Sequence, residues 1–358
     1  MNEPAPVITY TEGALGRIHL NRPKALNSLT LEMVHLIASG LDALEADGAI
    51  RAIALTGEGD RALCAGGDIK MIWSLGRSDP AAAMAFWAAE YRLNARIARL
   101  RKPWVALMDG ICMGGGVGLS VHGSHRVVTE RTRFAMPETR IGYFPDVGGT
   151  FALSRARQNL GLWIGLTGAT IGAADTIAAG LADAMVPSER LPALLGHLAS
   201  GRSADEALAA HAADPGPSEL AAHAGLIEAA FGAGRMADGI AVLREERSDF
   251  ARATLAHLER GSPTSHVLTL HLLRAAKASP DLETCLDREY AADALMLAGH
   301  DFYEGVRAAV IDKDGAPRWS PARLEEVDEA ALLAALHPLP SLFLELESAA
   351  PFEPGEAR

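Results

Sequence analysis

Two glycine-dense segments constrain the fold of this chain more than any other feature, because each comes shortly after a short apolar stretch. The stretch at 52–56 precedes Cys-Ala-Gly-Gly-Asp-Ile-Lys at 64–70, and the stretch at 104–108 precedes Met-Gly-Gly-Gly-Val-Gly-Leu at 113–119. Short, nearly continuous apolar runs are typical of strands buried on both faces. Glycine lets a backbone approach a ligand closely with its N–H groups unobstructed. The pattern therefore predicts buried strands that carry accessible backbone loops, the second of which opens a helix.

The other elements predict an α/β chain built from repeated ββα or βαβ units. Ser28 or Thr30 is suited to cap the first helix, since either side chain can accept from a backbone N–H. We expect a hairpin at 7–20, helices at 28–48 and 80–100, and two further short strands at 127–129 and 133–135.

The chain changes character after about Pro187, where alanine-rich helices interrupted by glycine and proline take over. We therefore expect two parts. The first is a core at 1–195 that carries the functional site, and the second is a helical region at 196–358.

The composition favours a cytoplasmic protein without metal, membrane or nucleic-acid partners. Of 358 residues 49% are hydrophobic, as in ordinary globular proteins, and the net charge of -12 argues against a basic nucleic-acid-binding face. The cysteines Cys64, Cys112 and Cys285 lack metal-ligand spacing and are expected to be reduced thiols. No apolar stretch approaches the ~18 residues that span a bilayer, and residues 1–13 lack the pattern of a signal or transit peptide.

The glycine segments have more than one interpretation. Amides at a helix start have no intrahelical partner, so two converging loops can donate two hydrogen bonds to one developing oxyanion. Loss of one such donor typically costs about 3–4 kcal/mol of barrier lowering. Glycine clusters also occur in plain tight turns. A nucleotide-binding loop is disfavoured, because Gly114, Gly116 and Gly118 do not fit G-x-G-x-x-G and no G-x-x-x-x-G-K-[ST] occurs.

The segment 136–149 places two acids, Glu138 and Asp146, among Met, Ile, Tyr, Phe, Val and two prolines. Such surroundings raise the pKa of a carboxyl group by desolvation, and it can then act as base, acid or nucleophile at neutral pH. Alternatively, either acid is a helix cap or a surface loop residue. His122 and His125, on the helix expected after the glycine triplet, are expected to be structural.

Several short motifs in a fixed order resemble the crotonase superfamily, the enoyl-CoA hydratases and isomerases. They are Asn-Arg-Pro-x-Ala-Leu-Asn at 21–27, Cys-Ala-Gly-Gly-Asp at 64–68, Gly-Gly-Gly at 114–116, Pro-Glu at 137–138 and Gly-Gly-Thr at 148–150. The match continues through 166–181. The resemblance implies a right-handed, ClpP-like spiral of ββα units with a helical C-terminal region, and a site for acyl-CoA thioesters.

The resemblance also implies roles for individual residues. The backbone N–H groups of Gly67 and Gly115 would form an oxyanion hole. CoA would be held by two segments, whose residues are Arg22, Lys24, Ala25, Gly66, Asp68 and Lys70. The cationic residues among them would offset the CoA phosphates. Asp68 is expected to fix its loop rather than to react.

Within the superfamily the chain is similar to the 3-hydroxyisobutyryl-CoA hydrolases. Hydratases use two glutamates, of which the second matches Glu138 and the first falls on Gly118, which has no side chain. Segments like those of the hydrolases occur at 113–123, 134–139, 144–149 and 301–319. The resemblance implies hydrolysis of a short-chain 3-hydroxyacyl-CoA in valine breakdown. Glu138 would be nucleophile or general base, Asp146 the second acid, and Glu90 a substrate-facing acid unless it is a solvated helix residue.

Two other functions stay open. A lyase or isomerase of the same fold would use Glu138 to move a proton without breaking the thioester bond. A non-catalytic acyl-CoA-binding protein would bind such thioesters without turnover. No cofactor is expected beyond the CoA of the substrate, and a homo-oligomer is possible, because the superfamily favours trimers and hexamers.

Overall fold

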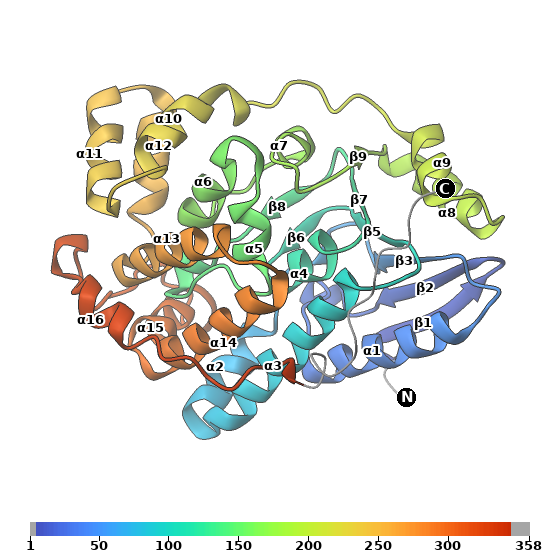
Figure 1. Ribbon diagram of the computed structural model, residues 1–358, viewed down its shortest axis with the longest axis horizontal. Helices are drawn as coiled ribbons and strands as arrows, with labels where there is room; N and C mark the ends of the chain where they lie inside the picture. The colour runs from blue at the N-terminus through green and yellow to red at the C-terminus, as the bar shows by residue number, and fades with distance from the viewer. Residues whose placement is uncertain (1–4, 345–358) are drawn as a thin grey trace.

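The protein, a computed structural model in which residues 5–344 are described, contains two β-sheets surrounded by helices (Figure 1). The larger sheet holds, in spatial order, β1 (Val7–Glu12), β2 (Leu15–Leu20), β3 (Ala52–Gly57), β5 (Trp104–Met108), β7 (His125–Val128) and β9 (Ala184–Met185). The smaller sheet holds β4 (Ala62–Cys64), β6 (Ile111–Met113) and β8 (Arg133–Ala135). Among the strands of residues 5–344, only β1 and β2 pair antiparallel, as the hairpin expected at 7–20, and the other strand pairs are parallel.

The strands repeat as ββα units, as the sequence predicts. The first unit, β1, β2 and the helix that follows, places both strands in the larger sheet. Each of the next three units gives its first strand to the larger sheet and its second to the smaller sheet, and then enters a helix. The helices that follow are α2 (Ile69–Ser78) and α3 (Pro80–Ala98) after β4, α4 (Gly115–Val121) after β6, and the 3-10 helix η2 (Glu138–Ile141) after β8. Each glycine segment therefore lies directly after a strand of the smaller sheet. Sequence reasoning missed β4, β6 and α2, since strands of three residues leave little periodic signal.

Local capping sets the ends of the first long helices. Thr30 caps α1 (Leu31–Ala46) by accepting a 3.3 Å hydrogen bond from the Met33 N–H, so Thr30 rather than Ser28 is the cap. Asp79 caps α3 in the same way, and Pro80 occupies its first position. Both helices lie within two or three residues of the predicted bounds.

Helices dominate the second half of the chain. The bounds are α5 (Gly149–Ser154), α6 (Leu160–Thr167), α7 (Ala173–Ala178), α8 (Leu191–Ala199), α9 (Ala204–His211), α10 (Ala224–Phe231), α11 (Met236–Glu246), α12 (Asp249–Leu258), α13 (Pro263–Lys277), α14 (Leu282–Ala298), α15 (Asp301–Val306) and α16 (Glu329–Ala334). In Figure 1, α10, α11 and α12 form the upper left corner of the molecule, while α8 and α9 lie at the upper right, where they pack against the strands of the larger sheet.

The last long helices pack on the first half of the chain. Helix α14 contacts α3, α13 contacts α5 and α15 contacts α2. One hydrophobic cluster includes buried residues from both halves, such as Trp87 and Phe302. A division near residue 195 stays a prediction about the organisation of the chain, but the core itself extends across that position.

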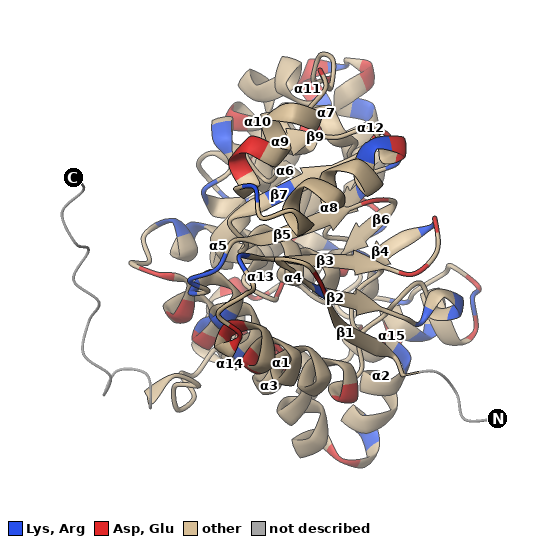
Figure 2. Ribbon diagram, turned by 90° about the vertical axis from the view of Figure 1, so that its right-hand side faces the viewer, with Lys and Arg blue, Asp and Glu red and all other residues tan. Residues whose placement is uncertain are grey.

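Charged residues are distributed over the outside of the molecule. Figure 2 shows Lys and Arg interspersed with Asp and Glu along the outer helices and loops. Across residues 5–344, none of the helices is both long and apolar enough to cross a membrane.

Candidate active site

The two glycine segments meet at one place. A Cβ atom built on Gly115 would lie 3.4 Å from the Gly67 nitrogen, and one built on Gly66 would lie 3.7 Å from the Gly115 nitrogen. Gly66 and Gly114 have φ angles of 108° and 49°, which favour glycine. The spiral thus brings together two loops that are nearly fifty residues apart in the sequence.

The amides of Gly67 and Gly115 have no hydrogen-bond acceptor among the described residues. Gly115 begins α4, so its N–H has no intrahelical partner. Leu29 holds the other loop, because its N–H donates to the Gly66 carbonyl and its carbonyl accepts from the Asp68 N–H, both at 2.8 Å. The arrangement leaves two fixed, unpaired donors in neighbouring loops.

Three acids surround these loops. Glu90 comes from α3, Glu138 from η2 and Asp146 from the loop after η2, and their exposed fractions are 2%, 7% and 7%. A Cβ on Gly114 would lie 3.0 Å from Glu138 Oε1, and one on Gly115 would lie 2.5 Å from Glu90 Oε1. Glycine is therefore required beside both glutamates.

All three acids hold their protons more tightly than usual. Burial, followed by the charge of Asp146, raises the pKa of Glu90 and of Glu138 well above the ordinary range. Burial raises the pKa of Asp146 to about 7, against the lowering effect of a Tyr91 hydrogen bond. Glu90 Oε1 and Glu138 Oε2 have no partner among the described residues. Buried, unpaired carboxyl atoms with raised pKa values are typical of functional sites.

A cavity of about 210 Å³ opens between the glycine loops and the three acids. Its other walls are mainly apolar and come from α2, α3, η2 and the segment after α15, with side chains that include Ile72, Phe86, Trp87, Ile141, Tyr143 and Ala309. The site therefore combines backbone donors, acids and an apolar enclosure, which is the usual composition of a small-molecule site.

Of the residues predicted to hold CoA, Gly66 lines this cavity, whereas the others lie outside its wall. Arg22 donates to the Ser28 carbonyl at 2.6 Å and pairs with Asp68 at 3.3 Å. Asp68 also caps α2, so both residues fix the loop. Lys70 is exposed and Ala25 is half-buried. The role of these residues in CoA binding stays a prediction.

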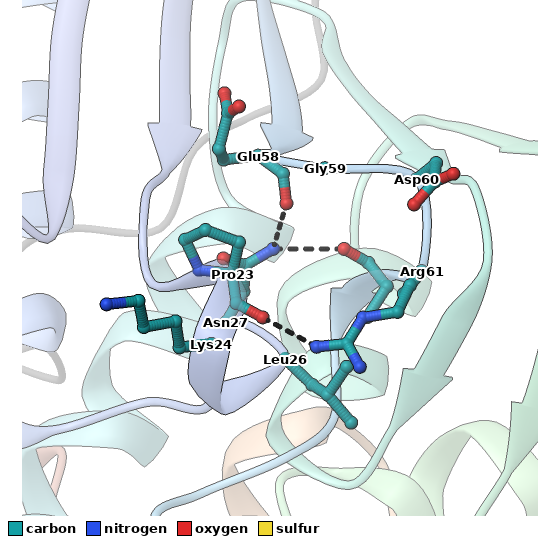
Figure 3. Close-up of a pocket in the computed structure, with 9 residues that line it drawn as sticks. Pro23, Lys24, Leu26, Asn27, Glu58, Gly59, Asp60 and Arg61 are labelled. Atoms are coloured by element: carbon teal, nitrogen blue, oxygen red, sulfur yellow. Dashed lines mark hydrogen bonds between the residues drawn. The ribbon is translucent and has the colours of Figure 1, made fainter.

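Lys24 lines a second cavity of about 270 Å³ (Figure 3). The Arg61 guanidinium donates to the Pro23 carbonyl at 3.0 Å, and the Asn27 amide donates to the carbonyls of Glu58 and Ala62. These bonds tie the loop that begins at Pro23 to the loop between β3 and β4.

Helix α14 supplies two buried acids that sequence reasoning missed. Glu289 accepts from the N–H groups of Gly148 and Thr150, at 2.7 and 3.1 Å, and Asp293 accepts from two tyrosine hydroxyls. The two acids are four residues apart, so they share one face of the helix. Acids at that spacing within the alanine-rich stretch 289–293 are the one signal by which the sequence marks them.

The two histidines near the site make structural contacts. His122 Nε2 donates to the Val147 carbonyl at 2.8 Å, and burial lowers the His122 pKa to about 4. His125 lies 3.2 Å from Asp205 on α9, away from the acids. The expected helix placement was wrong for His125, which begins β7, while His122 is the C-cap of α4, but the contacts of both agree with the structural role expected for them.

Gly118 on α4 has no room for a side chain. A Cβ there would lie 2.7 Å from the Val147 Cβ and 2.9 Å from the Asn94 side-chain nitrogen. The space that a glutamate would need at this position is filled by these two side chains.

Residues 15–336 match the family model described as enoyl-CoA hydratase/isomerase. The chain belongs to the enoyl-CoA hydratase/isomerase family. This assignment confirms the predicted crotonase fold. Two solved members of similar structure are a carnitinyl-CoA dehydratase from Mycobacterium thermoresistibile and an enoyl-CoA hydratase from Rhodobacter sphaeroides. The first is 44% identical with TM-score 0.90 and covers 95% of this chain and 98% of its own. The second is 40% identical with TM-score 0.88 and covers 94% and 98%.

Curated members of the family include mitochondrial 3-hydroxyisobutyryl-CoA hydrolases. The protein of Gallus gallus is 41% identical over 345 residues, which are 94% of this chain and 89% of the relative. The protein of Homo sapiens is 41% identical over 336 residues, which are 91% and 87%. The similarity to these family members therefore extends through the helical C-terminal region.

Proposed function

We propose that the protein hydrolyses a short-chain 3-hydroxyacyl-CoA thioester, with 3-hydroxyisobutyryl-CoA as its substrate and 3-hydroxyisobutyrate and CoA as products. The observation that carries the proposal is the position of Glu138, whose buried carboxyl lies against the glycine loop beside two unpaired amides. Relatives named 3-hydroxyisobutyryl-CoA hydrolase, 41% identical over most of the chain, support the choice of substrate.

The amides of Gly67 and Gly115 would bind the thioester carbonyl oxygen and stabilise the charge that develops on it. Glu138 either attacks the carbonyl carbon, which gives an acyl–enzyme anhydride, or removes a proton from an attacking water. In both routes the carbon–sulfur bond breaks and the CoA sulfur leaves with a proton. In the first route water then cleaves the anhydride, which releases the hydroxy acid and restores the Glu138 carboxyl group. Asp146 orients the 3-hydroxyl group or the water and assists that protonation.

The cavity supports a small, hydroxylated acyl group. About 210 Å³ suits a short acyl chain, and the apolar walls suit its methyl branch. The unpaired Glu90 Oε1 at the cavity wall offers an acceptor to a hydroxyl group of the substrate. A substrate without that hydroxyl would leave the buried acceptor unpaired, which is costly.

A lyase is the second candidate, because the similar solved structures are described as a dehydratase and a hydratase. Gly118 favours hydrolysis over this candidate. Family hydratases use a glutamate that matches this position, and Val147 and Asn94 leave no space for one. A non-catalytic acyl-CoA-binding protein is a third candidate.

A thiol-release assay over a panel of CoA esters tests the proposal. We expect release from 3-hydroxyisobutyryl-CoA to exceed that from 3-hydroxypropionyl-CoA and from straight-chain esters. Crotonyl-CoA consumption without thiol release would establish the lyase instead, and tight binding without turnover would establish the binding protein. Single-turnover hydrolysis in heavy-oxygen water separates the two routes, since only the anhydride route labels Glu138.

We further propose that the reaction needs no cofactor beyond the CoA of the substrate. We also propose that the protein acts in the cytoplasm and that it forms a homo-oligomer. The hydrolases of Gallus gallus and Homo sapiens are named mitochondrial, so cell fractionation is needed to test the location. Light scattering in solution tests the oligomeric state.

A further inference from the structure

A buried chain of hydrogen bonds links Asp146 to the C-terminal helix α14. The Tyr91 hydroxyl lies 3.3 Å from Asp146 Oδ2 and 3.0 Å from Asp293 Oδ1, and the Tyr143 hydroxyl contacts the same Asp293 oxygen. All four side chains are buried. Asp146 lines the cavity, whereas Asp293 is not among the residues of its wall. Tyr91 therefore connects an acid of the site to an acid outside it.

The number of hydrogen atoms available to these hydrogen bonds limits the charge that Asp146 and Asp293 can carry together. Tyr91 has one hydroxyl hydrogen and two carboxyl neighbours. If both acids were ionised, one carboxylate oxygen would face the bare Tyr91 oxygen. A buried contact between two unpaired acceptors is unfavourable. One added proton removes the conflict.

With that proton present, two arrangements place a hydrogen atom in each of the contacts among the two acids and the two tyrosines. In the first, Asp146 donates to Tyr91 and Tyr91 donates to Asp293. In the second, Asp293 donates to Tyr91 and Tyr91 donates to Asp146. The arrangements differ by the shift of one proton across each oxygen–oxygen contact, so the total charge is unchanged. Tyr143 donates to Asp293 in both.

We propose that Asp146 and Asp293 share one proton through the hydroxyl of Tyr91, and that Asp293 is a positioning residue that sets the protonation state of Asp146. Asp146 can then be either an acid or a carboxylate without exchanging a proton with solvent. The proposal rests on the proposed function only in the use that the reaction makes of this proton.

The surroundings favour a shared proton over ion pairing. The described acidic and phenolic side chains around the pair, from α3, η2 and α14, include Glu90, Glu138, Glu289 and Tyr290. The cation Arg92 on α3, near Tyr290, is exposed and donates to the Leu342 carbonyl at 3.2 Å. Arg140 lines the cavity, but its guanidinium donates to a backbone carbonyl of α6 at 3.2 and 3.1 Å. His122 likewise donates to a backbone carbonyl. Burial, followed by the charge of Asp146, raises the pKa of Asp293 well above its usual range.

Carboxyl NMR of the protein without substrate tests the proposal separately from the enzymatic activity. The protein is labelled with aspartate that carries carbon-13 at the side-chain carboxyl, and the two resonances are assigned with Asp146→Asn and Asp293→Asn. In the wild type we expect the resonances of both acids to move together in two shared titration steps. In Asp293→Asn, the loss of a like charge should lower the Asp146 midpoint by about one pH unit or more. Independent titration, with the same Asp146 midpoint in both proteins, would overturn the proposal.

A second variant should shift the Asp146 titration midpoint in the opposite direction. Tyr91→Phe removes a hydrogen bond that stabilises the Asp146 carboxylate, so the Asp146 midpoint should rise, and this variant decides the matter if Asp293→Asn does not fold. Tyr290→Phe is the control on α14, because the Tyr290 ring lies beside Tyr91 without a hydrogen bond to either acid. Its Asp146 midpoint should not change.

If the protein hydrolyses thioesters, the alkaline limb of the pH profile of kcat/KM should shift in the same directions as the Asp146 midpoint. If the protein does not hydrolyse thioesters, the NMR result still tests the shared proton.

Discussion

Glu289 on α14 accepts a 3.1 Å hydrogen bond from the backbone N–H of Thr150, near the start of α5 and 139 residues earlier in the chain. Helix α5 has no capping side chain of its own, so Glu289 supplies the missing cap, and it also binds the Gly148 N–H at 2.7 Å. The Asp146 carbonyl accepts from the Gly149 N–H at 2.6 Å within the same turn. The helix cap and the position of the Asp146 loop therefore depend on one buried carboxyl.

The substitution Glu289→Gln should lower stability and change its pH dependence. The Gln side chain has one acceptor oxygen in place of two, so it loses its hydrogen bond from either Gly148 or Thr150, and the free energy of unfolding should fall by about 1–3 kcal/mol. Burial raises the Glu289 pKa from 4.5 to about 8. Between these values the folded state binds more protons than the unfolded state, so Glu289 makes stability fall as pH rises. Urea unfolding from pH 5 to 8 should give a shallower fall in the variant.

An unchanged pH slope in Glu289→Gln would contradict this account. Glu283→Gln, on the same helix, is the control, because Glu283 pairs at 2.7 Å with a half-exposed Arg99. We expect it to change the unfolding free energy by less than about 1 kcal/mol.

The substitution Glu138→Gln should abolish most thioester hydrolysis. The amide can neither attack the carbonyl nor accept a proton from water, so kcat should fall by about a hundredfold to ten-thousandfold. Single-turnover thiol release measures the loss. Binding of free CoA should be retained, because the change is isosteric. Near-full activity would exclude both routes proposed for Glu138.

The substitution Gly115→Ala should lower kcat more than stability. The new Cβ would lie 2.5 Å from Glu90 Oε1, which displaces either the acid or the amide. Misplacing one oxyanion donor should reduce kcat by about a hundredfold to a thousandfold. Gly196→Ala on α8 is the control, since nothing lies within 4 Å of its Cβ, and it should keep full activity. Equal kcat values for the two variants would count against a role for this amide.

The substitution Gly118→Ala should destabilise the protein. Its Cβ would meet Val147 and Asn94 at 2.7 and 2.9 Å, and such overpacking typically costs about 1–3 kcal/mol. Thermal unfolding measures the effect, with Gly48→Ala at an open position as the control. Gly118→Glu should not gain hydration of crotonyl-CoA. A stable, hydrating Gly118→Glu variant would mean that hydratase chemistry fits this cavity.

Local sequence patterns predicted the parts of the site that lie close together in the chain. Apolar runs located β3 and β5, glycine runs located the two loops, and apolar neighbours of Glu138 and Asp146 indicated their burial. Glu90 was found through the family resemblance, because a single acid on a helix has no local signature. The structure buries it against Gly115, which excludes the alternative of a solvated residue.

Contacts between distant segments could not be predicted in this way. Tyr91 and Asp293 are 202 residues apart, and Tyr143 and Asp293 are 150 apart. Helical periodicity indicates that Asp293 lies on a buried face, but not which side chains it meets. The strands β4 and β6 were likewise missed, because they form the smaller sheet by pairing with each other. The sequence of a short apolar segment does not show which segment it pairs with.

The late position of α14 in the chain has a consequence for biosynthesis. After Thr150 the ribosome must add 139 residues before Glu289 is made, and after Tyr143 it must add 150 before Asp293 is made. Until then the turn before α5 lacks its cap, the Tyr143 hydroxyl lacks its acceptor, and Tyr91 can bond to Asp146 alone. The nascent protein therefore acquires its complete acid pocket only after α14 has been made and docks.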